Sequence, residues 1–205
     1  MRKRLVEHRL PSLALSHGQA LWVLRHALPP DGRPTPTFDA YIKYLRREGV
    51  PFAPEELGRG PGQNVVYAYE HLMELGVALT LRAQSILPAD VAHLLAEFRN
   101  ELRPIYRIAY TEQDCGRGML ILLPIGKGKP LRFAGIHLDL GLHYHESGAI
   151  STTGPKALGP EQAVTSFITR GLSQYFKPLI ALSDLAIQVV TLAVDAPEIK
   201  RGRQS

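Results

Sequence analysis

The chain has 205 residues, of which 45% are hydrophobic and 21% are charged, and its formal net charge is +5 at pH 7. These values are typical of a globular protein that buries its own core and needs no covalent cross-links. The single cysteine, Cys115, excludes an intramolecular disulfide and a zinc site built from several cysteines.

The positive charge is unevenly distributed along the chain. Residues 1–60 carry 10 Lys or Arg and 6 Asp or Glu, residues 61–110 carry 4 and 5, and residues 111–205 carry 10 and 8. The excess at the start favours a polyanionic partner for that end. The alternative is a basic protein whose charge serves only solubility.

Targeting and membrane segments are not indicated. The basic start Met1–Arg4 is not followed by the apolar stretch of a secretory signal. The most apolar run, Pro178–Val194, contains Ser183 and Asp184 and is shorter than the ~20 residues that cross a bilayer. We therefore expect a cytoplasmic protein without a membrane partner.

Two helices are predicted near the N-terminus. Ser16 is placed to cap a helix over His17–Leu28, which the Pro/Gly-rich connection then ends. Thr35 as N-cap and Pro36 as first residue predict a second helix over Pro36–Glu48. Its apolar side chains share one stripe, its basic side chains lie off that stripe, and Gly49 follows as its C-terminal cap. Arg46 and Arg47 in its last turn also complement the helix dipole, which is an alternative reason for their presence.

The next segments are predicted from glycine and proline positions. Residues 52–64 are rich in both and favour a tight hairpin or wing with Arg59 at its tip. A helix is expected over Val65–Leu75, closed by Gly76 and followed by a short apolar segment. Another begins at Pro88 and runs to about Leu102, where Pro104 breaks or kinks it.

From residue 111 onward the pattern changes to strands. The apolar run Met119–Ile125 predicts a buried strand, and the alternation over Leu131–Glu146 predicts a hairpin. Residues 147–160 read as a loop, Glu161–Tyr175 as a helix, and Pro178–Val194 as a helix by its length. We therefore predict an α+β fold. A helical module over residues 1–110 precedes an α+β domain over residues 111–205, with an antiparallel hairpin and long helices.

The N-terminal half resembles MerR-type regulators. The stretch Tyr41–Phe52, an aromatic and basic helix that closes on Gly followed by apolar residues and Pro, is similar to the end of that family's recognition helix. The stretch Val66–Leu79 resembles the segment after the family's wing. The turn before the second helix, Pro29–Thr35, is longer than the tight turn of a helix-turn-helix, and the basic residue usual beside the wing tyrosine is missing at Tyr67.

This resemblance implies a winged helix-turn-helix that binds double-stranded DNA as a homodimer. A recognition helix lies in the major groove and needs side chains that reach base edges and phosphates. The candidate DNA-binding residues are Arg33, Thr37, Lys43, Tyr44, Arg46, Arg47 and Arg59.

Histidines follow one parity of the alternating segment. His137, Asp139, His143 and His145 share that parity, so on one straight strand they would project from one face. His and carboxylate side chains suit Zn, Fe or Mn, which makes a metal-dependent enzyme the alternative function. However, His137 and His143 would be about 20 Å apart on a straight strand, unless a bulge at Gly141 bends it. A polar strand facing solvent or a partner is the expectation, with no metal and no cofactor.

Three function classes therefore compete. The sequence favours a DNA-binding transcriptional regulator, not an enzyme, whose C-terminal domain serves dimerisation or the sensing of a small-molecule effector. The alternatives are a metal-dependent enzyme on the histidine strand and a structural or interaction protein that does not bind nucleic acid.

Overall fold

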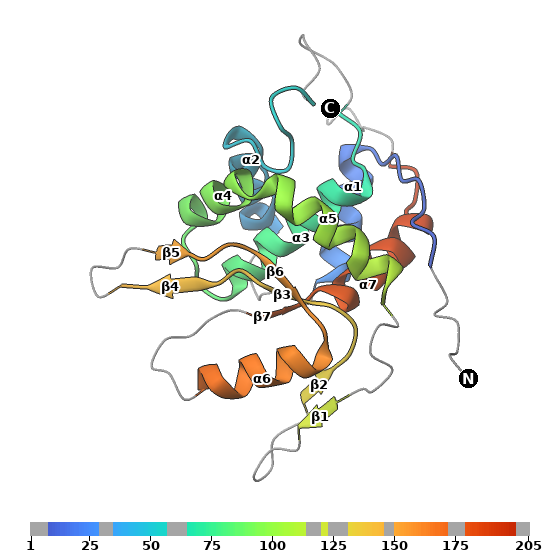
Figure 1. Ribbon diagram of the computed structural model, residues 1–205. Coiled ribbons are helices and arrows are strands. Elements are labelled where there is room, and N and C mark those ends of the chain that lie inside the picture. The colour runs from blue at the N-terminus through green and yellow to red at the C-terminus, as the bar shows by residue number, and fades with distance from the viewer. Residues whose placement is uncertain are drawn as a thin grey trace. The chain divides into compact units, whose positions relative to one another are not determined.

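The computed structural model describes residues 8–28, 35–56, 65–113, 120–122, 131–145, 150–171 and 179–199. The fold mixes helices with small antiparallel sheets (Figure 1), which confirms the predicted α+β class. The chain forms two compact units, each made of two stretches of sequence. The helical unit comprises Pro11–Arg99 and Ile187–Ser205, and the mixed unit comprises Met1–Leu10 and Asn100–Ala186. We predicted a domain boundary near residue 110, which lies at the end of the helix α5 (Arg99–Thr111). The first stretch of the helical unit ends earlier, at Arg99, where α5 begins.

The helical unit begins with α1 (His17–Ala27), whose start is fixed by a reciprocal pair of hydrogen bonds. The backbone N–H of Gln19 donates to Ser16 Oγ (3.4 Å), and the N–H of Ser16 donates to Gln19 Oε1 (3.0 Å). This capping box satisfies two N–H groups that a helix start leaves without partners. The predicted cap and helix are confirmed.

The helix α2 (Thr35–Arg47) buries one face and ends at a glycine, as its sequence predicts. Tyr41, Ile42 and Leu45 are at most 5% exposed. Gly49 has a φ of +83°, and the N–H of Val50 donates to the carbonyl of Leu45 (2.8 Å). A residue with positive φ after the last turn lets the chain fold back onto the helix carbonyls, which favours glycine at this position.

The helix α3 (Tyr69–Ala83) differs from the prediction at both ends. Residues 65–68 are not helical, and Tyr67 instead pairs with Leu15 through two backbone hydrogen bonds of 2.8 and 3.0 Å. Gly76 does not end the helix. The residues around it are buried on every side, and Ser85, with a φ of +68°, terminates the turn beyond α3. Tertiary burial has overridden the weak helix preference of glycine.

The next helix also breaks at a different place than predicted. The chain forms α4 (Pro88–Glu97) and α5 (Arg99–Thr111), with the break at Phe98. Pro104 lies inside α5 and does not end it. Phe98 still donates to the Leu94 carbonyl (3.1 Å), and Arg99 is then buried against Glu74 of α3. In the helical unit, α3 contacts both α1 and α4.

The mixed unit contains three small antiparallel sheets. The first pairs β1 (Leu120–Leu122) with β2 (Leu131–Phe133). The second has β3 (His137–Asp139) between β6 (Lys156–Leu158) and β7 (Leu179–Ala181). The third pairs β4 (Leu142–Tyr144) with β5 (Ile150–Thr152). The helix α6 (Pro160–Gly171) packs against β1, β2 and β6 (Figure 1).

Several predictions for this half need correction. The alternating segment 131–146 supplies strands to three different sheets, because Gly135 (φ +62°) and Gly141 (φ +58°) interrupt it. The predicted loop over 147–160 contains β5 and β6. The final apolar run is not helical throughout, since β7 precedes α7 (Leu182–Val194). The predicted helix after residue 160 and the antiparallel pairing are confirmed.

A buried serine fixes the start of α7 in the mixed unit. Ser183 Oγ accepts a hydrogen bond from the N–H of Ile136 (2.8 Å) and donates to the Ala109 carbonyl (2.7 Å). A Cβ at Gly135 would lie 2.5 Å from Ser183 Cβ, so glycine is needed there for space as well as for its positive φ. These contacts tie α5, the segment before β3 and α7 together.

Candidate nucleic-acid interface

The outer face of α2 carries most of the candidate DNA-binding side chains. Thr37, Lys43 and Arg47 are exposed, while Tyr44 and Arg46 are partly buried. Lys43 and Arg47 are four residues apart and therefore share a face of the helix. Among the described residues, Lys43 makes no ion pair, so its charge is available to a ligand. Arg33 and Arg59 lie outside the described residues, as does the tip of the predicted wing.

An ion pair from α1 offsets the one acidic side chain in the first half of α2. Arg25 Nη2 lies 2.6 Å from Asp39 Oδ1, and the same guanidinium lies 5.2 Å from the Phe38 ring centroid. An acidic side chain beside a phosphate-binding face would repel the ligand. Arg25 therefore offsets the negative charge of Asp39 that would otherwise weaken DNA binding by α2. The sequence offered no signal for this pair, because its members are on different helices.

Arg47 contacts two side chains that are close to it in sequence. Its Nε donates to Glu48 Oε1 (3.0 Å), and its guanidinium lies 5.2 Å from the Tyr44 ring centroid. The Arg47 side chain remains 73% exposed, so a phosphate can still approach it. The surface ion pair is worth little in free energy and would exchange readily for a ligand anion.

A buried ion pair between Arg99 and Glu74 fixes the end of α2. Arg99 donates from Nη2 to Glu74 Oε1 (2.8 Å) and from Nε to both carboxylate oxygens (3.1 and 3.2 Å). The same Nη2 donates to the carbonyl of Gly49. Arg99 thus ties the C-terminal turn of α2 to α3, which limits the movement of the basic last turn.

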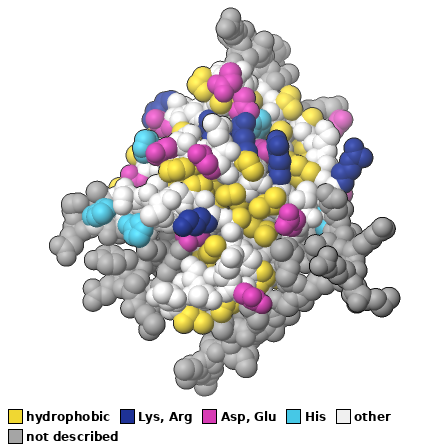
Figure 2. Space-filling view, viewed as in Figure 1, with side chains coloured by type: hydrophobic (Ala, Val, Ile, Leu, Met, Phe, Trp, Pro, Cys, Tyr) yellow, Lys and Arg dark blue, Asp and Glu magenta, His cyan; other side chains and the backbone are white. Residues whose placement is uncertain are grey.

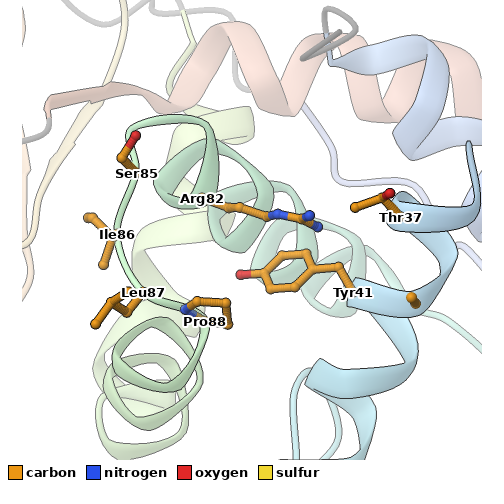
Figure 3. A pocket seen from close by; sticks show the side chains of 8 residues that line it. Thr37, Tyr41, Arg82, Ser85, Ile86, Leu87 and Pro88 are labelled. Carbon is orange, nitrogen blue, oxygen red and sulfur yellow. The ribbon is translucent and has the colours of Figure 1, made fainter. Parts of the chain in front are cut away.

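Two hollows lie beside α2 within the helical unit. The first, of about 420 Å³, is lined by residues of α2, the end of α3 and the connection to α4. Figure 3 shows Arg82 reaching from α3 so that its guanidinium lies over the Tyr41 ring, 4.1 Å from the centroid, and close to Thr37. The Thr37 and Ser85 hydroxyls also line this hollow. Sequence reasoning missed Arg82, because nothing in its own segment marks it.

The second hollow, of about 550 Å³, lies at the start of α1. Arg46, His17, Val65 and Ile199 are among its lining residues. Nearby, His17 Nδ1 lies 2.9 Å from the Tyr67 hydroxyl oxygen. Burial raises the pKa of Tyr67, and the Arg46 charge acts in the opposite direction. The hollow therefore combines a cation from α2 with the exposed start of another helix.

The described side chains on the face seen in Figure 2 are of mixed character. On the face seen in Figure 2, Lys and Arg side chains alternate with acidic and hydrophobic ones. The candidate interface therefore rests on α2, Arg82 and their immediate neighbours rather than on the net charge of the chain.

The histidine segment does not form a common polar face. His137 and Asp139 are buried (3% and 7% exposed), because β3 is the middle strand of its sheet. His145 is exposed and contacts the Ser151 hydroxyl (2.8 Å), and His143 is partly buried. The expectation of a strand facing solvent or a partner is therefore wrong for His137 and Asp139.

The buried members of this segment have local structural contacts. Asp139 Oδ1 accepts the N–H of Gly141 (2.8 Å), which stabilises the turn after β3. The His137 ring packs 5.5 Å from the Phe133 ring, and burial lowers the pKa of His137. Within the described part of the chain, no three His, Cys, Asp or Glu side chains gather in a way that could hold a metal ion.

Comparison with protein-family models, with curated proteins and with solved structures finds no match. None of the helices in the described ranges has the length and apolar character required to span a membrane.

Proposed function

We propose that the protein is a DNA-binding transcriptional regulator that uses α2 as its recognition helix. The proposal rests on the exposed face of α2, which carries Thr37, Lys43 and Arg47. Arg99 fixes the end of this helix through its hydrogen bond to the Gly49 carbonyl. A recognition helix must be rigid, and its outer side chains must reach phosphates and base edges.

Further support comes from the elements around α2. The backbone pairing of Leu15 with Tyr67 brings the segment before α1 next to the segment that follows the predicted wing. The order of two helices, a Gly/Pro-rich segment and a further helix matches the family that the sequence resembles. Arg82, held over Tyr41, adds a candidate phosphate contact beside the first turn of α2.

We further propose that the protein acts in the cytoplasm as a homodimer, so that two copies of α2 read half-sites about one DNA turn apart. The mixed unit would then serve dimerisation or the binding of a small-molecule effector. Size-exclusion chromatography with light scattering tests the dimer. A monomer at micromolar concentration would refute that part of the proposal.

Fluorescence anisotropy with labelled duplexes tests the DNA contact. We expect Lys43→Ala/Arg47→Ala to lower affinity and to reduce the slope of log K against log[salt] by roughly 1 to 2, since each lost phosphate contact removes about 0.9. The matched control is Arg9→Ala/Lys156→Ala, which removes two exposed charges from the mixed unit. Equal effects of the two double variants would mean that only net charge matters.

A further inference from the structure

The hollow beside the first half of α2 contains an oriented cation. The Arg82 guanidinium lies 4.1 Å from the Tyr41 ring centroid. Within the described ranges, this guanidinium makes no ion pair and donates no hydrogen bond to the protein. Stacking on an aromatic ring fixes the plane of a guanidinium and leaves the N–H groups at its edge for an acceptor. Arg82 is therefore held in position with its donors available to a ligand.

The other described residues that line this hollow are uncharged. Leu87 and Pro88 supply apolar surface, and Leu87 is 65% exposed, so a ligand can reach it. In Figure 3, Arg82 and Tyr41 lie between Thr37 of α2 and the pair Leu87 and Pro88 at the start of α4. The volume of about 420 Å³ is in the range of ~300–1,000 Å³ that is usual for small-molecule sites. The hollow thus combines one positive charge with an apolar wall.

From this arrangement we infer that the hollow binds a small organic carboxylate that has an apolar body. A guanidinium and a carboxylate can form two parallel, charge-assisted hydrogen bonds. Because Arg82 is the one cation among the described lining residues, the site matches the single charge of a carboxylate better than the double charge of a phosphate. The apolar part of the ligand would cover Leu87 and Pro88 and remove their surface from water.

This inference places a small-molecule site in the helical unit, beside the helix that we propose contacts DNA. Arg82 is also the candidate phosphate contact near the first turn of α2, and a bound carboxylate would neutralise its charge. The ligand should therefore lower the affinity for DNA. That consequence rests on the proposed function, whereas the binding of the carboxylate does not.

The first test titrates 2-naphthoate, an aromatic carboxylate, into the full-length protein by isothermal titration calorimetry. We expect a dissociation constant on the order of 1 mM or lower, as for other ligands of this size. The neutral amide of the same shape, 2-naphthamide, and inorganic phosphate, which lacks an apolar body, should each bind roughly tenfold more weakly. No binding of 2-naphthoate, or equal binding of 2-naphthamide or phosphate, would overturn the inference.

Two variants test whether the probe occupies this hollow. Arg82→Gln removes the cation and should weaken the binding of 2-naphthoate by roughly tenfold or more. Ala40→Leu keeps every charge, and because Ala40 is exposed and lines the hollow, the longer side chain should fill part of it and also weaken binding. The matched control, Arg9→Gln, makes the same change at an exposed arginine of the mixed unit and should leave the dissociation constant unchanged. Undiminished binding by either test variant, with the circular dichroism of the unchanged protein, would overturn the placement.

A last measurement separates this inference from the proposed function. Saturating 2-naphthoate should weaken duplex binding by the unchanged protein and have little effect on duplex binding by Arg82→Gln. An equal effect on both proteins would overturn the competition at Arg82. A full chain that binds no duplex would overturn the proposed function, while the titrations with 2-naphthoate would still decide the carboxylate site.

Discussion

Removal of Arg99 should destabilise the helical unit strongly, because its partner is buried. The Glu74 side chain is 1% exposed and that of Arg99 is 10% exposed. Arg99→Leu would remove the buried cation that faces Glu74, which costs about 3–5 kcal/mol. The Gly49 carbonyl would also lose a donor, so we expect the upper part of that range. This loss is comparable to the whole free energy of unfolding of many domains.

Urea unfolding followed by circular dichroism measures this loss. The control is Arg47→Leu, the same change at an exposed ion pair, which should cost less than about 1 kcal/mol. Glu74→Leu/Arg99→Leu should recover most of the stability, because apolar replacement of both partners removes the buried carboxylate together with its cation. If Arg99→Leu does not fold, Arg99→Lys provides an intermediate. A loss below 1 kcal/mol for Arg99→Leu, or a double variant no more stable than it, would refute the reasoning.

Three further predictions concern stability and use the same unfolding assay. Gly135→Ala should lower the free energy of unfolding by about 2–4 kcal/mol, because Gly135 has a φ of +62° and an added Cβ would lie 2.5 Å from Ser183 Cβ. The control is Gly159→Ala, which should be nearly neutral because an added Cβ there meets no atom within 4 Å. Ser16→Ala should cost about 1 kcal/mol through loss of the α1 cap, and an unchanged midpoint would show that the capping box contributes nothing. Burial lowers the pKa of His137 in the folded protein, so the fold favours the neutral ring. The free energy of unfolding should therefore be highest above pH ~6.5 and fall as the pH drops below that value. His137→Leu should weaken this pH dependence. An identical pH profile in His137→Leu would contradict this assignment.

Local sequence signals predicted the elements that local chemistry determines. Ser16 with Gln19, and Gly49 after the apolar stripe of α2, mark helix ends through hydrogen bonds within a few residues. Such signals involve only residues that are close together in the sequence. They therefore located α1 and α2 to within one or two residues.

Elements determined by tertiary packing were not predictable in this way. Gly76 looks like a helix end, yet it lies inside α3 because its neighbours are buried on every side. The strand β3 is buried on both faces, so its alternating sequence did not reveal which side chains face solvent. Strands of three residues, such as β5 and β6, are too short to show a period.

The candidate site was predicted in part for the same reason. The basic residues of α2 are adjacent in sequence and could be identified as one face. The Arg25–Asp39 pair and the Arg82–Tyr41 contact join residues from different helices, so only the fold brings them together.

We propose that the chain binds DNA at defined sequences through α2. Genome-wide footprinting of DNA bound by the full-length protein tests it most directly. We predict enrichment at discrete sites, each containing two related half-sites separated by about one helical turn, ~34 Å, and loss of that enrichment in Lys43→Ala/Arg47→Ala. No enrichment over unrelated sequence, or the same enriched sites in the double variant, would contradict the account.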